Sequence, residues 1–384
     1  MARLGDICIQ ITDGSHNPPM GVEQSNYLML SSKNIDDDYI TLNDPRYLSQ
    51  EDFEAENRRT NIKPNDLLIT IVGTIGRVAI VPNSLTEFCV QRSVAVLKPK
   101  PEIVYNRFLM HYLQSMRPYL EQESRGVAQK GIYLKQLSNL SIILPPLDEQ
   151  RKIAAVLDKV SDLIAKRRQQ LDKLDEIVKS RFIEMFGDPV DNPHGFRKVV
   201  LSELAEIRIG PFGSLLHKED YIEGGHPLLN PSHIVDGKVA PDSKLTISDK
   251  KYDELEAYHL HTGDVVMGRR GEMGRCAVVP SEGFLCGTGS LLIRTKGEVT
   301  ADYIQKTISF PSFRKTIEDM AVGQTMPNLN VPIVSKFQII KPPIEVQINY
   351  YKFVAQTDKS KLAIQKSLEK LEILKKSLMQ KYFG

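Results

Sequence analysis

The chain has 384 residues, 41% of them hydrophobic and 26% charged, which is an ordinary globular composition with room for two or three domains. No apolar run approaches the roughly 18 residues of a membrane span, and the first residues, MARLGDICIQ, lack the apolar core of a signal peptide. The net charge of +2 gives no support by itself to nucleic-acid binding, so such a function must rest on local features.

The four cysteines are isolated from one another in the sequence. Cys8, Cys89, Cys276 and Cys286 form no CxxC or CxxxH cluster. Isolated thiols in a long chain are typical of a reducing cytosol and favour neither a disulfide nor a structural zinc. We therefore expect a cytoplasmic protein.

In chain order, the globular stretches alternate short β-branched runs with Gly, Pro and Asn turns, which predicts an α+β fold. The first half carries the predicted strands ITIV, VAIV and SVAVLKP, and the second half carries SLLIRTK. A helical stretch is predicted at NRFLMHYLQSMRPYLEQ and again at ADYIQKTISFPSFRKTIED. No alternation of strands and helices with a glycine fingerprint indicates a nucleotide-binding fold.

A long helix is predicted directly after Pro145-Pro146, with Asp148 as its cap and Gln150 in its first turn. Its apolar residues recur at alternating steps of four and three, the spacing of a coiled coil, and Arg167 and Arg181 interrupt this seam. The predicted pairing residues are Ile153, Leu157, Val160, Ile164, Leu171, Leu174 and Val178, followed by Met185. The pattern ends at FGDP, where glycine and proline supply a stop.

The chain contains the same unit twice. The stretch from PPLDEQ to FG at 145–187 aligns without a gap with the stretch from PPIEVQ to FG at 342–384, and Gln150 then falls on Gln347. The second seam is formed by Tyr350, Val354, Ile364, Leu368, Leu371 and Leu378, and it is weakened by Lys361 and Lys375. A G-x-x-G-R turn also occurs in both halves and ends at Arg77 and Arg275. These matches indicate a tandem duplication.

Neither helix can bury its apolar stripe alone, so the two are expected to pair with each other. We therefore predict an α+β protein with two similar globular domains separated by two long antiparallel helices that form a coiled coil, with pseudo-two-fold symmetry. The predicted globular domains are 1–144 and 188–341, and the helical repeats are 145–187 and 342–384. The alternative is that each helix packs separately on its own domain.

The stretch HNPPM at 16–20 is similar to the Asn-Pro-Pro-aromatic signature of enzymes that methylate adenine in DNA. Met20 stands where the stacking ring is required, and no glycine-rich turn of an S-adenosylmethionine pocket accompanies it. The two G-x-x-G-R turns lack the Lys-Ser/Thr of a phosphate loop, and no Ser/His/Asp or Cys/His arrangement is evident. The sequence therefore predicts a chain without catalysis, metal or cofactor of its own.

Polar and cationic loop residues are instead candidates for DNA recognition. Arginine bonds guanine, asparagine and glutamine bond adenine, and lysine and serine bond phosphate. Gln91-Arg92-Ser93 on an expected strand and Thr288-Gly289-Ser290 are assigned to equivalent places in the two halves. The predicted DNA-binding residues are Ser15, His16, Lys33, Asn34, Arg77, Gln91, Arg92, Ser93, Gln129, Lys130, Arg269, Arg270, Arg275, Thr288, Ser290, Gln324 and Asn328.

With this duplication, LPPLDEQRKIAAVLDKV at the first long helix and DGSHNPP near the start, the chain resembles the specificity subunits of type I restriction–modification enzymes over its whole length. The resemblance implies two target-recognition domains that each read one half of a split double-stranded DNA site, with the helical repeats setting the spacing. It also implies two docked copies of a methyltransferase subunit, which would bring S-adenosylmethionine and the catalytic motif, and a restriction translocase subunit. The methylation signature would then belong to the partner.

The second helical copy departs from this pattern, because Val346 and Ile348 stand where Glu149 and Arg151 stand in the first. This departure puts equal affinity for the two partner copies in doubt. Two other functions stay open. One is a fused single-chain methyltransferase or nuclease, and the other is a coiled-coil adaptor that binds only protein.

Overall fold

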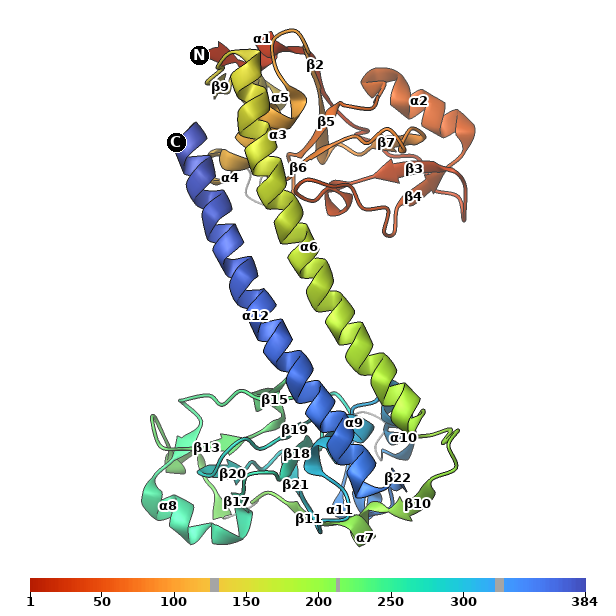
Figure 1. The fold of residues 1–384 in the computed structure, drawn as a ribbon, viewed down its shortest axis with the longest axis vertical. Helices are drawn as coiled ribbons and strands as arrows, with labels where there is room; N and C mark the ends of the chain where they lie inside the picture. The colour runs from red at the N-terminus through yellow and green to blue at the C-terminus, as the bar shows by residue number, and fades with distance from the viewer. Residues whose placement is uncertain (125–130, 212–214, 322–327) are drawn as a thin grey trace. The chain divides into compact units, whose positions relative to one another are not determined.

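The computed structural model describes residues 1–124, 131–211, 215–321 and 328–384. The chain divides into two compact units (Figure 1). Unit 1 comprises Met1–Leu171 and Ala363–Gly384, and unit 2 comprises Asp172–Leu362. Each unit therefore contains one globular part and one end of each long helix, α6 (Leu147–Phe186) and α12 (Ile344–Phe383). The domain boundaries expected from the sequence, which separate helices from globular parts, stay predictions.

The globular part of unit 1 mixes helices and strands. Its elements are β1 (Ala2–Arg3), α1 (Leu4–Ile7), β2 (Cys8–Asp13), β3 (Tyr27–Leu30), η1 (Ser32–Asn34), β4 (Arg46–Leu48), α2 (Gln50–Thr60), β5 (Leu67–Thr70), β6 (Val78–Ile80), β7 (Phe88–Val90), β8 (Val94–Pro99), α3 (Asn106–Ser115), α4 (Arg117–Glu123), α5 (Leu134–Ser138) and β9 (Ser141–Ile142). An antiparallel sheet has the order β2-β8-β5-β6, a second sheet has the order β4-β3-β7, and β1 pairs with β9. The strands predicted from VAIV and SVAVLKP are confirmed as β6 and β8, whereas ITIV at 69–72 overlaps only the second half of β5.

Strand β5 shows why the apolar runs are continuous rather than alternating. Its residues are all buried, and successive side chains point to opposite faces of the sheet. Leu67 and Ile69 lie in the cluster that includes the residues of α3. Leu68 lies in a second cluster with Leu30 and Phe88 of the β4-β3-β7 sheet. The sheet is therefore covered on both faces, which favours apolar residues at successive positions, and the polar Thr70 at the end of β5 is buried as well.

Unit 2 contains counterparts of these elements together with additional short strands and 3₁₀ helices. They are β10 (Arg197–Val200), α7 (Leu201–Leu204), β11 (Ala205–Ile209), η3 (Lys218–Asp220), β12 (Tyr221–Ile222), β13 (His226–Leu229), η4 (Pro231–His233), β14 (Ile234–Val235), β15 (Lys238–Val239), β16 (Thr246–Ile247), α8 (Asp249–Glu254), η5 (Glu256–Tyr258), β17 (His259–Leu260), β18 (Val265–Gly268), β19 (Cys276–Val278), β20 (Phe284–Cys286), β21 (Ser290–Thr295), α9 (Ala301–Ile308), α10 (Pro311–Met320), α11 (Val331–Ser335) and β22 (Gln338–Lys341). The predicted strand SLLIRTK is β21.

The two units share one plan. The sheet β2-β8-β5-β6 of unit 1 corresponds to β11-β21-β18-β19 of unit 2, and β1-β9 corresponds to β10-β22. The parallel pair β3-β7 corresponds to the parallel pair β13-β20. In unit 2 the second sheet is wider, because β12 and β17 extend its two edges. The predicted α+β class with two similar globular domains is thus confirmed.

Each predicted helical stretch of the globular parts is divided in two. In unit 1, α3 ends at Ser115 and α4 follows with Pro118 in its first turn. In unit 2, α9 ends at Ile308 and α10 begins at Pro311. A proline is tolerated in the first turn of a helix but removes a hydrogen bond from its interior, so a break precedes each proline.

A buried glutamine ties the start of each long helix to its own globular part. Gln150 accepts a hydrogen bond from the backbone N–H of Tyr105 (2.8 Å) and donates to the carbonyl of Ile103 (3.1 Å). Gln347 accepts in the same way from the backbone N–H of Thr300 (2.9 Å). Both side chains are buried, so the glutamine identified by the repeat satisfies partly buried backbone groups where the helix meets its globular part.

Helices α6 and α12 pack against each other within each unit and run antiparallel (Figure 1). In unit 1, Leu157 near the start of α6 lies in the same apolar cluster as Leu378 near the end of α12. In unit 2, the hydroxyl of Tyr350, early in α12, donates to the carbonyl of Val178, late in α6 (3.2 Å). The predicted pairing is therefore confirmed, and the start of each helix also packs against its own globular part.

The lysines expected to weaken the seam have acidic partners. Lys361 pairs with Asp175 of α6 (2.5 Å) in unit 2. Lys375 pairs with Asp38 of the globular part (3.1 Å) in unit 1. Each ammonium group is thus paired with a carboxylate, and both lysine side chains are largely buried. No helix in the described part of the chain combines the length and hydropathy that crossing a membrane requires.

Candidate nucleic-acid interface

Several loops of unit 1 meet at one edge of its two sheets. Ser15, after β2, forms an isolated parallel β-bridge with Gln91 in the β7–β8 turn. The backbone N–H of Gln91 donates to the carbonyl of Leu30 at the end of β3 (2.8 Å), and that of Ile71, after β5, donates to the carbonyl of Ser93 (2.9 Å). We call this convergence of Ser15, Ser31–Asn34, Ile71–Thr74 and Gln91–Ser93 the loop edge of unit 1.

The β7–β8 turn lies at the centre of the loop edge. Gln91-Arg92-Ser93 forms this turn and not a strand, which corrects the expectation from the sequence. The backbone N–H of Arg92 donates to the carbonyl of Ser15 (2.8 Å), and the guanidinium side chain is exposed. Among the described residues, no carboxylate pairs with Arg92. A cation in this setting can bond a phosphate or a guanine edge without first breaking an ion pair.

Other predicted residues of this edge are already engaged within the chain. His16 contacts Asp13 (2.7 Å), and Lys33 pairs with the exposed Asp44 (2.5 Å). Asn34 is fully buried, and its amide bonds the loop backbone at Ser31, Thr41 and Asn43. His16 and Lys33 reach the surface, whereas Asn34 holds the loop in shape.

Unit 2 builds the same edge with different side chains. The backbone N–H of Gly287 donates to the carbonyl of Leu229 (3.1 Å), and that of Arg269 donates to the carbonyl of Gly289 (3.0 Å). These bonds repeat those of Gln91 with Leu30 and of Ile71 with Ser93. Thr288 is therefore the counterpart of Arg92, and the equivalence expected from the sequence is shifted by one residue.

In both units a glycine directly follows the first strand of the sheet, β2 or β11, because the backbone there passes very close to the backbone of the turn. A Cβ atom on Gly14 would lie 1.8 Å from the carbonyl oxygen of Val90. One on Gly210 would lie 2.0 Å from the carbonyl oxygen of Gly287. No side chain fits either position without moving the turn, so the glycines keep both loop edges in the same geometry.

The cations of the loop edge of unit 2 are Arg269 and Arg270. Burial and the charge of Arg270 lower the pKa of Arg269, and its Nε donates to the carbonyl of Leu329 (3.0 Å). Arg270 is exposed and forms a bridge with Asn328. Ser290 is fully buried as the first residue of β21, so it does not reach this surface. The predicted residues Gln129, Lys130 and Gln324 lie outside the described residues.

The arginines of the G-x-x-G-R turns form ion pairs within the chain. Gly73 and Gly76 have φ values of 83° and 81°, which only glycine adopts without strain. Arg77 pairs with Asp36 (2.8 Å), and Arg117 donates to the carbonyl of Gly76 (3.1 Å). A DNA contact by Arg77 stays a prediction, and its observed partner is internal.

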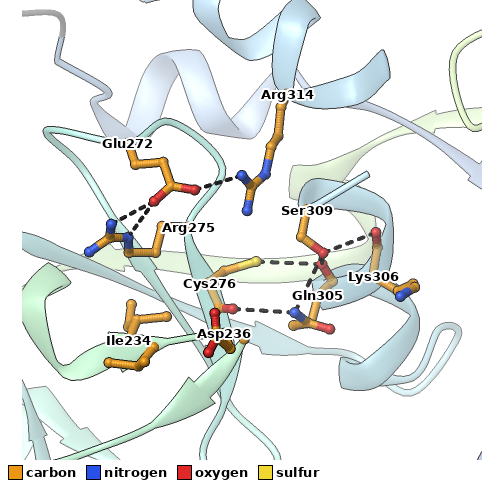
Figure 2. Close-up of a pocket in the computed structure, with 11 residues that line it drawn as sticks. Ile234, Asp236, Glu272, Arg275, Cys276, Gln305, Lys306, Ser309 and Arg314 are labelled. Carbon is orange, nitrogen blue, oxygen red and sulfur yellow. Dashed lines mark hydrogen bonds and ion pairs between the residues drawn. The ribbon is translucent and has the colours of Figure 1, made fainter. Parts of the chain in front are cut away.

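Figure 2 shows the corresponding turn of unit 2, which borders a hollow of about 400 Å³. Glu272 accepts from Arg275 (2.5 Å) and from Arg314 of α10 (2.7 Å), so both guanidinium groups are held by one carboxylate. Burial raises the pKa of Cys276 in the same hollow to about 12, which keeps its thiol protonated and unreactive. The hollow therefore contains bracing ion pairs and no activated nucleophile.

The sequence reasoning missed Arg117 and Arg314, which hold the two turns. They occupy equivalent places in the repeat, because the alignment that places Gln150 on Gln347 also places Arg117 on Arg314. Their position on a helix rather than in a glycine-rich turn concealed them. The repeat alignment itself was the signal that could have found them.

The Asn-Pro-Pro stretch forms a loop whose carbonyl groups are engaged within the chain. Arg46 of β4 donates from Nη1 to the carbonyl of Pro19 (2.7 Å) and lies 3.5 Å from that of Pro18. A methylation site of this kind needs its backbone carbonyl for the amine of the flipped adenine. Within the described ranges, no group of three His, Cys, Asp or Glu residues could hold a metal ion.

Comparison with known proteins gives a consistent result. The sequence family described as type I restriction modification DNA specificity domain matches residues 24–176 and 193–375. The chain is 20% identical over 348 residues to the type I restriction enzyme MjaVIII specificity subunit of Methanocaldococcus jannaschii, covering 84% of this chain and 79% of that protein. It is 35% identical over 128 residues to the EcoBI specificity subunit of Escherichia coli, covering 33% of this chain and 27% of that protein.

Solved structures show the same fold. The S subunit of the type I restriction–modification system from M. genitalium superposes with a TM-score of 0.58 at 14% identity, covering 100% of this chain and 95% of that chain. A chain from a structural study of complex assembly and conformational transition of the type I system gives 0.60 at 18% identity, covering 100% and 96%.

Proposed function

Because the chain belongs to the family of type I restriction–modification DNA specificity domains, and is a DNA-recognition component rather than the enzyme, we propose that each unit reads one half of a bipartite double-stranded DNA target. The observation that carries this proposal is the repeated loop edge. Both units hold the β-turn against the neighbouring loops with two matching backbone bonds, while the exposed side chain at the turn is arginine in one and threonine in the other.

A constant frame with variable side chains suits the recognition of two different half-sites. Backbone bonds fix where each turn lies, and the side chains determine which base edges or phosphates can be bonded. Arg92 supplies a guanidinium in unit 1, whereas Arg269 and Arg270 supply cations from the neighbouring loop in unit 2. The two units are therefore expected to prefer different base sequences.

The experiment that tests this proposal is a map of adenine methylation across a genome in cells that carry the chain and its methyltransferase partner. We expect one motif with two defined halves and a non-specific spacer of constant length. In the Arg92→Ala variant, one half should lose about 1–3 kcal/mol of discrimination, while the other half keeps its sequence. The Arg270→Ala variant should affect the opposite half. A change in both halves from either variant would contradict one reader per unit.

We also propose that the paired helices set the spacer between the two halves. A helix of defined length separates two readers more precisely than a flexible linker does. Insertion of seven residues into both α6 and α12 adds roughly 10 Å of helix, or about three base pairs at 3.4 Å each. The mapped spacer should lengthen by that amount.

Insertion of the same seven residues into α6 alone is the matched control. It leaves α12 short, so the seam contacts of at least one unit must be lost, and specific methylation should fall steeply. Circular dichroism of the purified variant checks that its helices still form. Retention of the original spacer and activity by the single-helix variant would refute this role of the helices.

The remaining parts of the proposal concern partners. We propose that the helical repeats dock two copies of a methyltransferase subunit, that S-adenosylmethionine binds to those copies, and that a restriction translocase subunit joins the assembly. Val346 and Ile348 replace Glu149 and Arg151 in the second helical copy, so the second docking event should be weaker. Native mass spectrometry over a titration of the methyltransferase subunit would resolve the two steps.

Two rival functions have direct tests. A fused methyltransferase would bind S-adenosylmethionine by itself, which calorimetry on the pure chain would detect, and we expect no heat of binding. A coiled-coil adaptor would bind its partner without any sequence preference. Gel shifts of the assembled complex on the mapped target and on a random duplex would separate an adaptor from a specificity subunit.

A further inference from the structure

Met20 is the most exposed large apolar side chain of the loops in unit 1. Its relative exposure is 91%, and it ends the stretch His16-Asn17-Pro18-Pro19. One exposed methionine is unremarkable on a protein surface. Its position matters here, because the segment that carries it is held rigidly and continues from the loop edge.

The segment is fixed on both sides of Met20. Before it, Ser15 forms a bridge with Gln91. After it, the backbone N–H of Val22 donates to the carbonyl of Tyr47 (2.9 Å). Arg46 holds the middle through the carbonyl of Pro19 (2.7 Å).

Two consecutive prolines stiffen the same segment by restricting its backbone. Gly21, directly after Met20, packs closely on β4, since a Cβ there would lie 3.0 Å from Cγ of Arg46. The segment therefore presents Met20 to solvent in a defined position. Little backbone conformational entropy therefore remains to be lost when a ligand contacts the segment.

The surroundings of Met20 are polar and point to nucleic acid. His16 and Asn17 are exposed on the same segment, and both carry groups that bond bases or phosphates. The carbonyl of Ser15, where the segment begins, accepts from the backbone N–H of Arg92 (2.8 Å). A duplex that contacts the Arg92 turn therefore meets the methionine segment as a continuation of the same surface.

Resting on the proposed function, we propose that Met20 is an apolar wedge that inserts between two base pairs of the half-site read by unit 1. Proteins that contact the minor groove insert methionine, leucine, isoleucine or proline in this way, and the inserted side chain unstacks the step and kinks the duplex. A stiff loop with one apolar tip, polar neighbours and a nearby cation has the required features. The Asn-Pro-Pro stretch then serves to support a wedge and has no part in methyl transfer.

The test uses the chain assembled with its methyltransferase on a duplex that carries the methylation-mapped target. Permanganate reactivity of thymines reports unstacked steps, and each step of both half-sites is probed in turn. With wild-type chain we expect one reactive step in the half-site of unit 1, separate from the adenine that becomes methylated. Met20→Ser should abolish that reactivity and weaken binding roughly tenfold, because the apolar contact is lost.

Two matched variants control the test. Met20→Leu keeps the apolar volume and should retain the reactive step. Ile9→Ser removes an exposed apolar side chain of β2, with 69% relative exposure, and should change neither the reactivity nor the affinity. Full reactivity in Met20→Ser would overturn the wedge.

Other outcomes separate this inference from the function on which it rests. If Met20→Ser no longer assembles with the methyltransferase, Met20 belongs to a protein interface and the wedge is wrong. If the wild-type complex methylates no bipartite target, the proposed function itself fails. If it methylates such a target without an unstacked step outside the methylated adenine, only the wedge fails.

Discussion

The junction between the long helices and the globular part differs between the two units. In unit 2, Phe182 and Phe186 of α6 pack against Tyr350 of α12, with ring centroids 5.5 and 5.3 Å apart. In unit 1, Phe383 of α12 packs on Phe108 at 5.6 Å, and the adjacent contact is the ion pair of Lys375 with Asp38. The junction of unit 2 is therefore aromatic, whereas the junction of unit 1 is partly ionic.

This contrast shows that one backbone plan accepts different chemistry at the same place. Phe186 and Phe383 are identical in the repeat, but Val178 stands where Lys375 stands. A junction must be closely packed, and its charged groups must have partners. Aromatic packing meets the first need and a paired charge meets the second. Duplicated halves can therefore diverge in side chains without a change of fold, at the junction as at the loop edge.

The largest expected effect is on the aromatic junction. Phe186 is fully buried, so Phe186→Ala should destabilise unit 2 by about 3–5 kcal/mol through the cavity that it leaves. Phe383 is only partly buried, and Phe383→Ala should destabilise unit 1 by about 2 kcal/mol. Amide hydrogen exchange followed separately in each unit measures both losses. Equal losses would mean that the two junctions depend equally on their aromatic residues.

A smaller effect should be the same in both units. Gln150→Ala and Gln347→Ala each leave a partly buried backbone N–H without its acceptor, which costs about 1–3 kcal/mol. The free energy of unfolding from urea titration should fall by similar amounts in the two variants. Gln169→Ala and Gln365→Ala, at exposed sites on the same helices, are the controls and should have little effect. A large difference between the two buried sites would contradict their shared role.

The smallest effect should depend on pH and be confined to unit 1. Burial acts to raise the pKa of Asp38, but Lys375, Gln114 and His111 outweigh it and lower the pKa below the ordinary 3.8. A lowered folded-state pKa adds stability above that ordinary value, and the contribution is lost as the pH falls through the folded-state pKa. Lys375→Ala should therefore cost about 1 kcal/mol at pH 7 and less near pH 3.

Lys376→Ala, which changes the exposed neighbouring lysine, is the control for this measurement. Thermal unfolding at pH 7 and pH 3 compares the two variants with wild type. A loss in Lys375→Ala that stays constant between the two pH values would show that the methylene stem, and not the charge, supports the junction.

Much of the architecture could be predicted from the sequence because its signals are local or repeated. The heptad spacing marked both long helices, and their pairing followed from the need to bury a stripe on each. Gln150 and Gln347 were recognisable as a pair because the repeat aligned them, although their hydrogen bonds became visible only in the structure. The β-branched runs marked β5, β6, β8 and β21 for the same local reason.

The candidate site was predicted less well, because polarity in a loop does not show which way a side chain points. Asn34 and Ser290 were expected at the surface and are buried. Gln91-Arg92-Ser93 was expected on a strand and forms a turn, and its partner in unit 2 is shifted by one residue. Each of these features depends on hydrogen bonds between segments far apart in the chain, which no local pattern encodes.

The sequence by itself determined that this chain is a duplicated α+β protein with two long paired helices, because periodicity and internal repetition are properties of the chain alone. Only the tertiary structure decided which loops meet at each edge, which arginines are free of carboxylates among the described residues, and that Lys375 finds Asp38. The physical reason is that burial and pairing depend on neighbours brought together by folding, and residues distant in sequence supply those neighbours.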